Sequence, residues 1–422
     1  MKQSATLAAQ LAEAAQIVAR VAGGRSLNEE IGRLNELDSR AALIDLTHGT
    51  LRRYGRVQAI VGKLSRRGRP DAQIEALLWC ALYALESARH AEHTVVDEAV
   101  KACGLIERWP VKGYVNALLR AFLRQRSALE AQLSADPQAA YQHPEWWIEL
   151  ARAAYPDAWQ VVLAAGNDHP PMALRINRRR TAIEAYARRL DEQGIAARGL
   201  AIDGLLLERP LPIERLPGFA AGEVSVQDTG AQRAAHCLDL QAGQRVLDAC
   251  AAPGGKSAHI LELADVELTA LDIDAARARR IEPNLERLGL RARIHVADAS
   301  RPDDWWDGRP FDRILADVPC SASGIARRHP DVKWLRRAAD IGAFAERQRA
   351  ILTALWRVLA PGGKLLYATC SIFPQENEAV VERFAAGEPT ALRLPPGDGA
   401  PPQWLPDNEH DGFYYALIAK RA

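Results

Sequence analysis

Two cysteines at the ends of predicted strands are the residues best suited to covalent chemistry in this sequence. Cys320 follows the strand-like run 311–317, and Cys370 follows the strand-like run 364–369. Because parallel strands present their carboxyl ends at one edge of a sheet, we expect both thiols at the same rim. A single cysteine of this kind is usually a packing residue. Two of them beside a predicted ligand loop indicate nucleophilic chemistry.

The predicted ligand loop joins a strand-like run, 245–248, to a helix-like run, 256–264. It has the sequence Ala-Cys-Ala-Ala-Pro-Gly-Gly-Lys, and its small residues let the backbone approach a ligand closely at the end of the first strand. Its glycine spacing differs from those of the dinucleotide fingerprint and the phosphate-binding loop. The loop therefore predicts a ligand that has no pyrophosphate.

Two aspartates follow the next two predicted strands. Asp272 is placed to accept hydrogen bonds from two ribose hydroxyls, and Asp298 is placed to accept one from an adenine amino group. Each of them alone is also explained as an ordinary helix N-cap. With Asp248 at the end of the first strand, three successive strand ends carry an acid, and this favours a pocket for S-adenosylmethionine.

Methyl transfer to carbon 5 of cytosine explains why such a pocket would need thiols. Carbon 5 is a poor nucleophile until a thiolate adds to carbon 6, and the adduct must later lose the carbon 5 proton and the thiol. Asp317 ends the strand before Cys320 and is placed to hydrogen-bond the N3 and N4 edge of the base. The N-terminus of a predicted helix just after Cys370 is our hypothesis for what favours the thiolate.

The spacing of apolar residues divides the chain into three predicted regions. Residues 1–140 have helical periodicity and predict an all-helical domain, while residues 145–235 alternate short strand-like and helical runs and predict a small α/β module. Residues 236–422 alternate strands and helices regularly, which predicts a doubly wound, mostly parallel, Rossmann-like sheet. The predicted fold class is α/β, preceded by an all-α domain.

Three basic segments are candidate RNA contacts. Residues 51–70 contain seven arginines and lysines and no acid, residues 175–180 read Arg-Ile-Asn-Arg-Arg-Arg, and residues 327–334 combine basic and aromatic side chains. Each would attract a polyanion. An ordinary solvated surface explains each segment about equally well.

The composition excludes several classes of protein. The chain of 422 residues is 48% hydrophobic and 25% charged with a net charge of +1, which is typical of a globular protein. Its apolar N-terminal stretch is interrupted by polar residues and predicts an amphipathic helix, so we expect no membrane span, no secretory signal and a cytoplasmic location. Six cysteines without a CxxC pair predict neither disulfides nor a metal site. We expect a monomer.

Three of these motifs together resemble one enzyme family. Residues 248–256, Asp317-Val-Pro-Cys320 and Thr369-Cys-Ser371 are similar to motifs of the Nop/Sun-type RNA cytosine-5 methyltransferases. The order of a helical domain like the antitermination factor NusB, a small middle module and a catalytic domain resembles the members that act on 16S ribosomal RNA. The resemblance covers essentially the whole chain, including the run 327–336.

The resemblance implies that Cys370 is the nucleophile and that Cys320 helps to release the product. In DNA cytosine-5 enzymes, by contrast, a cysteine that follows a proline, as Cys320 does, is the nucleophile. It also implies S-adenosylmethionine as cofactor and 16S ribosomal RNA as partner. Gly230 stands where the family more usually has a serine, which leaves a hydroxyl role there in doubt. The implied cofactor contacts are Cys250, Ala251, Ala252, Pro253, Gly254, Gly255, Lys256, Asp272, Asp298 and Asp317. From the residues alone, Cys250 is expected only to fill space beside the ligand.

Two other functions stay open on the sequence alone. An enzyme that methylates an amino group of adenine or cytosine would also use an Asp-x-Pro loop, but it would leave Cys370 without a role. A ribosome-assembly or antitermination factor would bind RNA through the helical domain without catalysis. The intact cofactor and thiol motifs argue against that second alternative.

Overall fold

The computed structural model describes residues 6–34, 40–65, 68, 70–200, 204–397 and 399–422. The chain forms two compact units, each described here by itself. The first consists of Met1–Asp168 and Ala326–Arg337, and the second of His169–Ile325 and Ala338–Ala422. Residues 145–168, which the sequence analysis placed in the middle module, therefore pack with the first unit.

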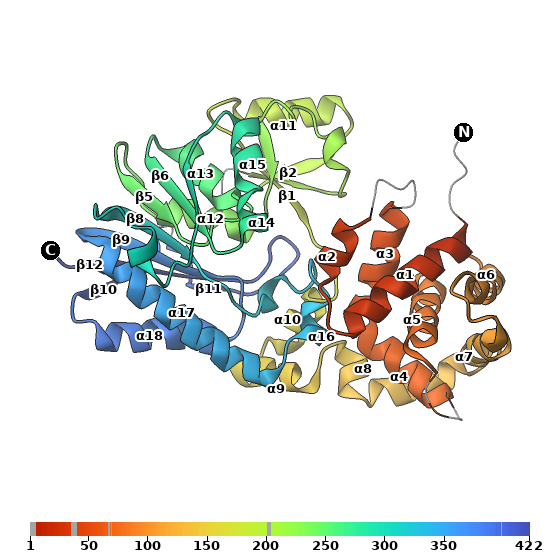
Figure 1. The fold of residues 1–422 in the computed structure, drawn as a ribbon. Helices are drawn as coiled ribbons and strands as arrows, with labels where there is room; N and C mark the ends of the chain where they lie inside the picture. The colour runs from red at the N-terminus through yellow and green to blue at the C-terminus, as the bar shows by residue number, and fades with distance from the viewer. Residues whose placement is uncertain (1–5, 35–39, 66–67, 69, 201–203, 398) are drawn as a thin grey trace. The chain divides into compact units, whose positions relative to one another are not determined.

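The first unit is all-helical, as the apolar spacing predicted (Figure 1). Its central helix, α5 (Ala72–Ser87), is apolar on every side and buried from Ile74 to Leu85 apart from one half-buried glutamate. Asp71 caps its N-terminus, because its Oδ1 accepts hydrogen bonds from the Gln73 and Ile74 amides. The remaining helices before residue 168 are α1 (Leu7–Ala22), α2 (Leu27–Gly32), α3 (Arg40–Arg52), α4 (Tyr54–Leu64), α6 (Glu92–Leu105), α7 (Lys112–Ser134), α8 (Pro137–Tyr141), α9 (Glu145–Ala154) and α10 (Trp159–Ala165).

A short segment from later in the chain completes the first unit. It contains α16 (Val332–Leu335), and its Lys333 is fully buried. The Lys333 ammonium donates hydrogen bonds to three oxygens, the Arg52 and Gln142 carbonyls at 3.1 and 3.0 Å and Asn167 Oδ1 at 2.7 Å. A buried cation satisfied in this way is unavailable to a phosphate. The expectation of an RNA contact at 327–334 is therefore wrong for Lys333.

The second unit begins with a small antiparallel sheet of strand order β2-β3-β1-β4. Its core is the apolar side of β1 packed against α11. Gln227, just after β4, and the helix α12 lead from this sheet into the larger one. The elements are β1 (Met172–Ile176), α11 (Ile183–Glu192), β2 (Ala197–Gly199), β3 (Gly204–Leu207), β4 (Val224–Val226) and α12 (Thr229–Cys237).

The larger sheet has the strand order β10-β12-β9-β8-β5-β6-β7, with β11 (Gln403–Trp404) paired to β12. Strands β7, β6, β5, β8 and β9 are parallel to one another. Strand β12 pairs antiparallel with β9, and β10 pairs antiparallel with β12. One apolar cluster joins this sheet to α17 and α18, and another joins it to α12, α13 and α15 (Figure 1). The sheet is thus doubly wound and mostly parallel, as predicted.

Its elements follow the predicted runs closely. The parallel strands are β5 (Arg245–Asp248), β6 (Glu267–Asp272), β7 (Arg293–Val296), β8 (Phe311–Asp317) and β9 (Leu359–Thr369). The other elements are α13 (Gly255–Leu263), α14 (Ala275–Ala278), α15 (Ile281–Leu288), α17 (Ala338–Val358), α18 (Glu378–Gly387), β10 (Ala391–Leu394) and β12 (Phe413–Lys420). The single helix expected over 275–288 is broken into two.

Among the described residues, no helix is long and apolar enough to cross a membrane. The same residues contain no group of three or more His, Cys, Asp or Glu side chains arranged to hold a metal ion.

Candidate active site

The order of the parallel strands reverses beside β5. Strands β6 and β7 lie on one side of it, and β8 and β9 lie on the other. Doubly wound sheets bind their ligands at the carboxyl ends of the strands next to such a reversal. Asp248 ends β5 and Asp317 ends β8, while Cys370 follows the last residue of β9. The predicted site residues are therefore brought to one edge of the sheet.

The ligand loop lies between β5 and α13 and approaches its neighbours closely. Gly254 has a φ of +96°, and a Cβ added there would lie 3.1 Å from Ile281 Cγ2. A side chain at this position would be both strained and crowded. Cys250 is half-buried, and burial raises its pKa, which supports the expectation that it fills space and does not react.

Asp272 is held rigidly beside this loop. It is 3% exposed, and its two carboxylate oxygens accept hydrogen bonds from the Ala252 and Asp274 amides at 3.1 and 3.0 Å. The N-cap of α14 is Asp274, which accepts from Ala276 and Arg277. The alternative explanation of Asp272 as a helix N-cap is therefore wrong.

Asp298 is half-buried just beyond β7. Its Oδ1 accepts hydrogen bonds from the Ser300 amide at 2.9 Å and the Ser300 hydroxyl at 2.8 Å. These bonds occupy one oxygen and orient the carboxylate. Asp298 joins the ligand loop, Asp272 at the end of β6 and Asp317 at the end of β8 in a set of hydrogen-bond acceptors. This set has no phosphate cradle, and it fits the ribose, the adenine and the sulfonium charge of S-adenosylmethionine.

Asp248 is a buried acid for which sequence reasoning gave no separate role. It is 1% exposed, Ser257 Oγ donates to its Oδ2 at 2.6 Å, and its Oδ1 has no protein partner among the described residues. Burial raises the pKa of Asp248 to about 7. The signal in the sequence was an acid directly after an apolar strand.

Asp248→Asn is expected to change the pH dependence of stability. An acid whose pKa is raised on folding stabilises the protein below its unfolded pKa and loses that contribution as pH rises through its folded pKa. The raised pKa of Asp248, about 7, corresponds to a destabilisation on the order of 4 kcal/mol between pH 4 and 7. The melting temperature of Asp248→Asn minus that of the wild type, measured without cofactor, should therefore increase from pH 5 to pH 8.

The matched control for this prediction is Asp274→Asn. The pKa of Asp274 is lowered by hydrogen bonds from backbone amides, so this group stays ionised throughout the range from pH 5 to pH 8. Its substitution should shift the melting temperature by the same amount at every pH tested. A pH-independent difference for Asp248→Asn as well would contradict the prediction.

The two thiols lie in contact. Cys320 Sγ and Cys370 Sγ are 3.4 Å apart, with Cys320 buried and Cys370 half-buried. The hydrogen bond to Cys370, together with burial, holds the pKa of Cys320 well above its usual range. Either sulfur can donate the hydrogen in this contact.

Lys256 supplies a positive charge beside the thiols. Its Nζ donates to Asp317 Oδ2 at 2.5 Å. Burial alone would lower the pKa of Lys256, but Asp317 and the nearby Cys370 raise it above its ordinary value. The helix expected just after Cys370 is a short 3-10 turn, Pro374–Glu376, followed by α18 from Glu378. Sequence reasoning treated Lys256 only as a cofactor contact.

Gly230 is explained by packing. A Cβ on this glycine would lie 2.5 Å from Phe413 Cδ2, so a serine there would have to displace the aromatic ring. The nearby Asp228 accepts a hydrogen bond from the Gly230 amide at 2.8 Å and caps α12. The absence of a side chain at Gly230 therefore allows α12 to lie close to β12.

The segment 175–180 is largely structural. Arg175 is 1% exposed and makes two hydrogen bonds to Glu262, at 2.9 and 2.8 Å. It also donates to Gln227 Oε1 and the Gly255 carbonyl. A buried, fully paired guanidinium cannot bind a phosphate. The expected RNA contact is wrong for Arg175.

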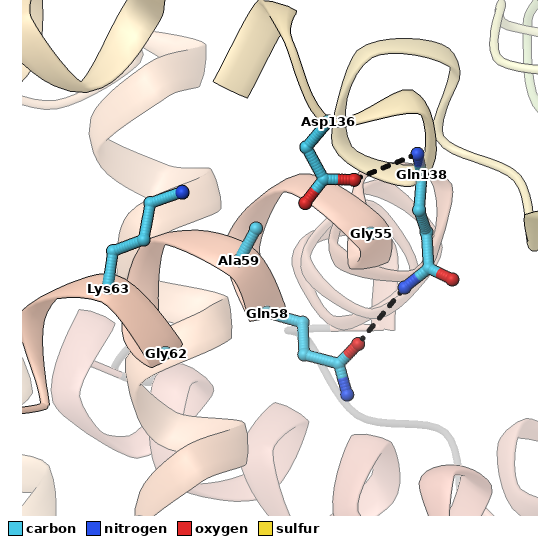
Figure 2. Close-up of a pocket in the computed structure, with 7 residues that line it drawn as sticks. All are labelled: Gly55, Gln58, Ala59, Gly62, Lys63, Asp136 and Gln138. Carbon is cyan, nitrogen blue, oxygen red and sulfur yellow. Dashed lines mark hydrogen bonds between the residues drawn. The ribbon is translucent and has the colours of Figure 1, made fainter. Parts of the chain in front are cut away.

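The segment 51–70 is only partly available to a polyanion. Arg52 is buried and donates to the Arg327 carbonyl, and Arg56 pairs with Glu86 and Glu130. Lys63 is exposed and borders a pocket of about 300 Å³ along α4 (Figure 2). Of the remaining basic residues, Arg66, Arg67 and Arg69 lie outside the described residues.

The fold and the site define an S-adenosylmethionine-dependent RNA methyltransferase. Residues 235–419 match the family model of the 16S rRNA methyltransferase RsmB/F. Residues 143–214 match the ferredoxin-like domain of RsmF/B-like methyltransferases, and residues 8–124 match the NusB family. The chain is 44% identical to the ribosomal RNA small subunit methyltransferase B of Vibrio cholerae, over 90% of this chain and 89% of the relative.

A second relative, the ribosomal RNA small subunit methyltransferase B of Pseudomonas syringae, is 42% identical over 98% of this chain and 97% of its own length. A crystal structure of a methyltransferase homologue from Pyrococcus horikoshii matches with a TM-score of 0.60 at 26% identity, covering 68% of this chain and 98% of the homologue. The chain therefore belongs to the 16S rRNA methyltransferase B/F family. The predicted family, fold class and cofactor are confirmed.

Proposed function

We propose that this chain transfers a methyl group to carbon 5 of a cytidine in 16S ribosomal RNA, through a covalent bond between Cys370 and carbon 6. The observation that carries the proposal is the pair of sulfur atoms at 3.4 Å, with Lys256 and Asp317 beside them. The names of the relatives, which are small-subunit ribosomal RNA methyltransferases, support this substrate. For such a substrate we expect the activity in the cytoplasm.

The reaction begins with addition of the Cys370 thiolate to carbon 6 of the base. Electron density moves toward N3, where the Lys256–Asp317 pair supplies a proton. Because Lys256 occupies Asp317 Oδ2, Oδ1 accepts a hydrogen bond from the exocyclic amino group. Carbon 5 thereby becomes nucleophilic. The ligand loop, Asp272 and Asp298 would hold S-adenosylmethionine, which would supply the methyl group that carbon 5 takes up.

Release of the product uses the second thiol. Once Cys370 Sγ is bonded to carbon 6, it no longer carries the negative charge that raised the pKa of Cys320. Cys320 then loses its own proton to solvent and, as a thiolate, removes the carbon 5 proton. The electron pair of that C–H bond restores the double bond between carbons 5 and 6, and the bond between Cys370 Sγ and carbon 6 breaks. Cys370 leaves as a thiolate, the carbon 5 proton remains on Cys320, and N3 returns its proton to the Lys256–Asp317 pair.

A 5-fluorocytidine-substituted 16S RNA fragment tests the reaction directly. Fluorine cannot leave carbon 5 as a cation, so methyl transfer should stop at a protein–RNA adduct that survives denaturing electrophoresis. Unsubstituted RNA should be methylated catalytically, and mass spectrometry of the nucleosides should find 5-methylcytidine. Methylation of an exocyclic amino group, without an adduct, would overturn the proposal in favour of an amino methyltransferase.

A further inference from the structure

A buried carboxylate connects the two loops that carry the thiols. Glu376 is 0% exposed, and its Oε1 accepts a hydrogen bond from the Ser321 amide at 2.7 Å. Its Oε2 accepts from Ser321 Oγ and from Ser371 Oγ, both at 2.6 Å. Ser321 directly follows Cys320, and Ser371 directly follows Cys370. Glu376 therefore contacts the residue that follows each of the two cysteines.

The loop of Cys370 has further anchors of its own. Asn377 Nδ2 donates to the Ser371 carbonyl at 2.9 Å, and Thr369 Oγ1 donates to Asn377 Oδ1 at 2.5 Å. The Ser371 amide donates to Thr369 Oγ1 at 3.2 Å. These bonds hold the backbone on both sides of Cys370 without using the Glu376 side chain.

The loop of Cys320 depends more directly on Glu376. The Ser321 amide donates to Glu376, and so does Gln348 Nε2, at 3.4 Å. The same Gln348 nitrogen donates to the Pro319 carbonyl at 3.0 Å. Glu376 thus orients the residue after Cys320 directly and the residue before it through Gln348.

A carboxylate in this position is costly to bury unless donors satisfy it. Burial raises the pKa of Glu376, while the hydrogen bonds from Ser321, Ser371 and Gln348 act in the opposite direction. Loss of one acceptor oxygen would leave a buried donor without a partner. Because the Ser321 amide and Gln348 Nε2 both donate to Glu376 Oε1, the loop of Cys320 is the one that would move.

We propose that Glu376 is a positioning residue that sets Cys320 for removal of the carbon 5 proton and thereby controls release of the methylated RNA. This inference rests on the proposed function, in which Cys320 acts after methyl transfer. Glu376 itself touches neither sulfur in the described contacts and acts through Ser321 and Gln348.

Glu376→Gln tests the inference, because the amide keeps the shape but replaces one acceptor oxygen with a donor. Displacement of a reacting group by about 1 Å costs on the order of 10²-fold. We expect kcat to fall by about that factor, with KM for RNA and single-turnover methyl transfer changed by less than about threefold. A protein–RNA adduct should accumulate with ordinary RNA. Glu378→Gln is the matched control, because Glu378 pairs with Arg393 and Tyr414 outside the cluster.

A second measurement reports the sulfur positions without RNA. Diamide, which takes up two electrons and two protons, should oxidise Cys320 and Cys370 of the wild type to a disulfide readily, because their sulfurs start 3.4 Å apart. The rate should fall at least about tenfold in Glu376→Gln and stay unchanged in Glu378→Gln. Ser321→Ala removes the Ser321 hydroxyl, with its bonds to Glu376, Ser323 and Ser371, but keeps the amide bond to Glu376. It should show the same changes more weakly if Glu376→Gln does not fold.

The outcomes separate this inference from the proposed function. If Cys320→Ala accumulates the adduct but Glu376→Gln neither accumulates it nor slows diamide oxidation, the inference is wrong and the proposed function stands. If Cys320→Ala itself accumulates no adduct, the proposed function fails first. Equal losses of methyl transfer and of release in Glu376→Gln would show a general structural role and would also overturn the inference.

Discussion

Cys370→Ala is expected to lower methyl transfer to 16S RNA by more than about 10³-fold and to form no covalent adduct, because the nucleophile is absent. Cys320→Ala should have the opposite signature. Its Cys370 still attacks and carbon 5 still takes up the methyl group, but no thiol removes the carbon 5 proton. A protein–RNA adduct that contains the methyl group should therefore accumulate and be visible on a denaturing gel.

The control for both variants is Cys103→Ala. Cys103 is buried in α6 of the first unit and donates to the Ala99 carbonyl, so its substitution should change stability but leave turnover unaltered. Reversed phenotypes would mean that Cys320 attacks and Cys370 assists release. If neither strand-end variant altered methylation, the two-thiol mechanism would be wrong.

Lys256→Met should give the other large effect. The substitution keeps most of the length of the side chain but removes the positive charge that pairs with Asp317 and acts on Cys370. We expect kcat/KM at pH 7 to fall by about 10²- to 10⁴-fold, the range associated with loss of acid–base assistance.

Lys256→Arg is the matched variant, because it keeps the charge with a different shape. It should keep more of the wild-type kcat/KM at pH 7 than Lys256→Met does. Cofactor affinity, measured by calorimetry with S-adenosylmethionine alone, separates the two predicted roles of this residue. If Lys256→Met lost activity only through weaker cofactor binding, the proposed role of its charge in the reaction would be contradicted.

The strand-end residues were predictable because of a general property of parallel sheets. Asp248, Asp272, Asp317 and Cys370 follow separate apolar runs, and the carboxyl ends of parallel strands share one edge. Their clustering therefore follows from strand direction alone. The same periodicity predicted the helical first unit and the doubly wound sheet.

Charges that are paired across long sequence separations were not predictable. Arg175 bonds to Glu262, which is 87 residues away, and Lys333 bonds to the Arg52 carbonyl, which is 281 residues away. In the sequence, both residues belong to basic runs that resemble an RNA-binding surface. Burial decides otherwise, because a cation enclosed by three or four acceptors stabilises the fold and is closed to a phosphate.

The sequence by itself predicted the class of chemistry. Separate predicted strands are each followed by a group that such chemistry needs, namely the ligand loop, Asp317 with Cys320, and Cys370. It also predicted the order of a helical domain, a small α/β module and a catalytic domain. Only the tertiary structure decided the 3.4 Å separation of the sulfurs and the placement of Lys256 and Glu376 around them. Side-chain distances depend on how loops from different strands pack, and no local pattern in the chain encodes that packing.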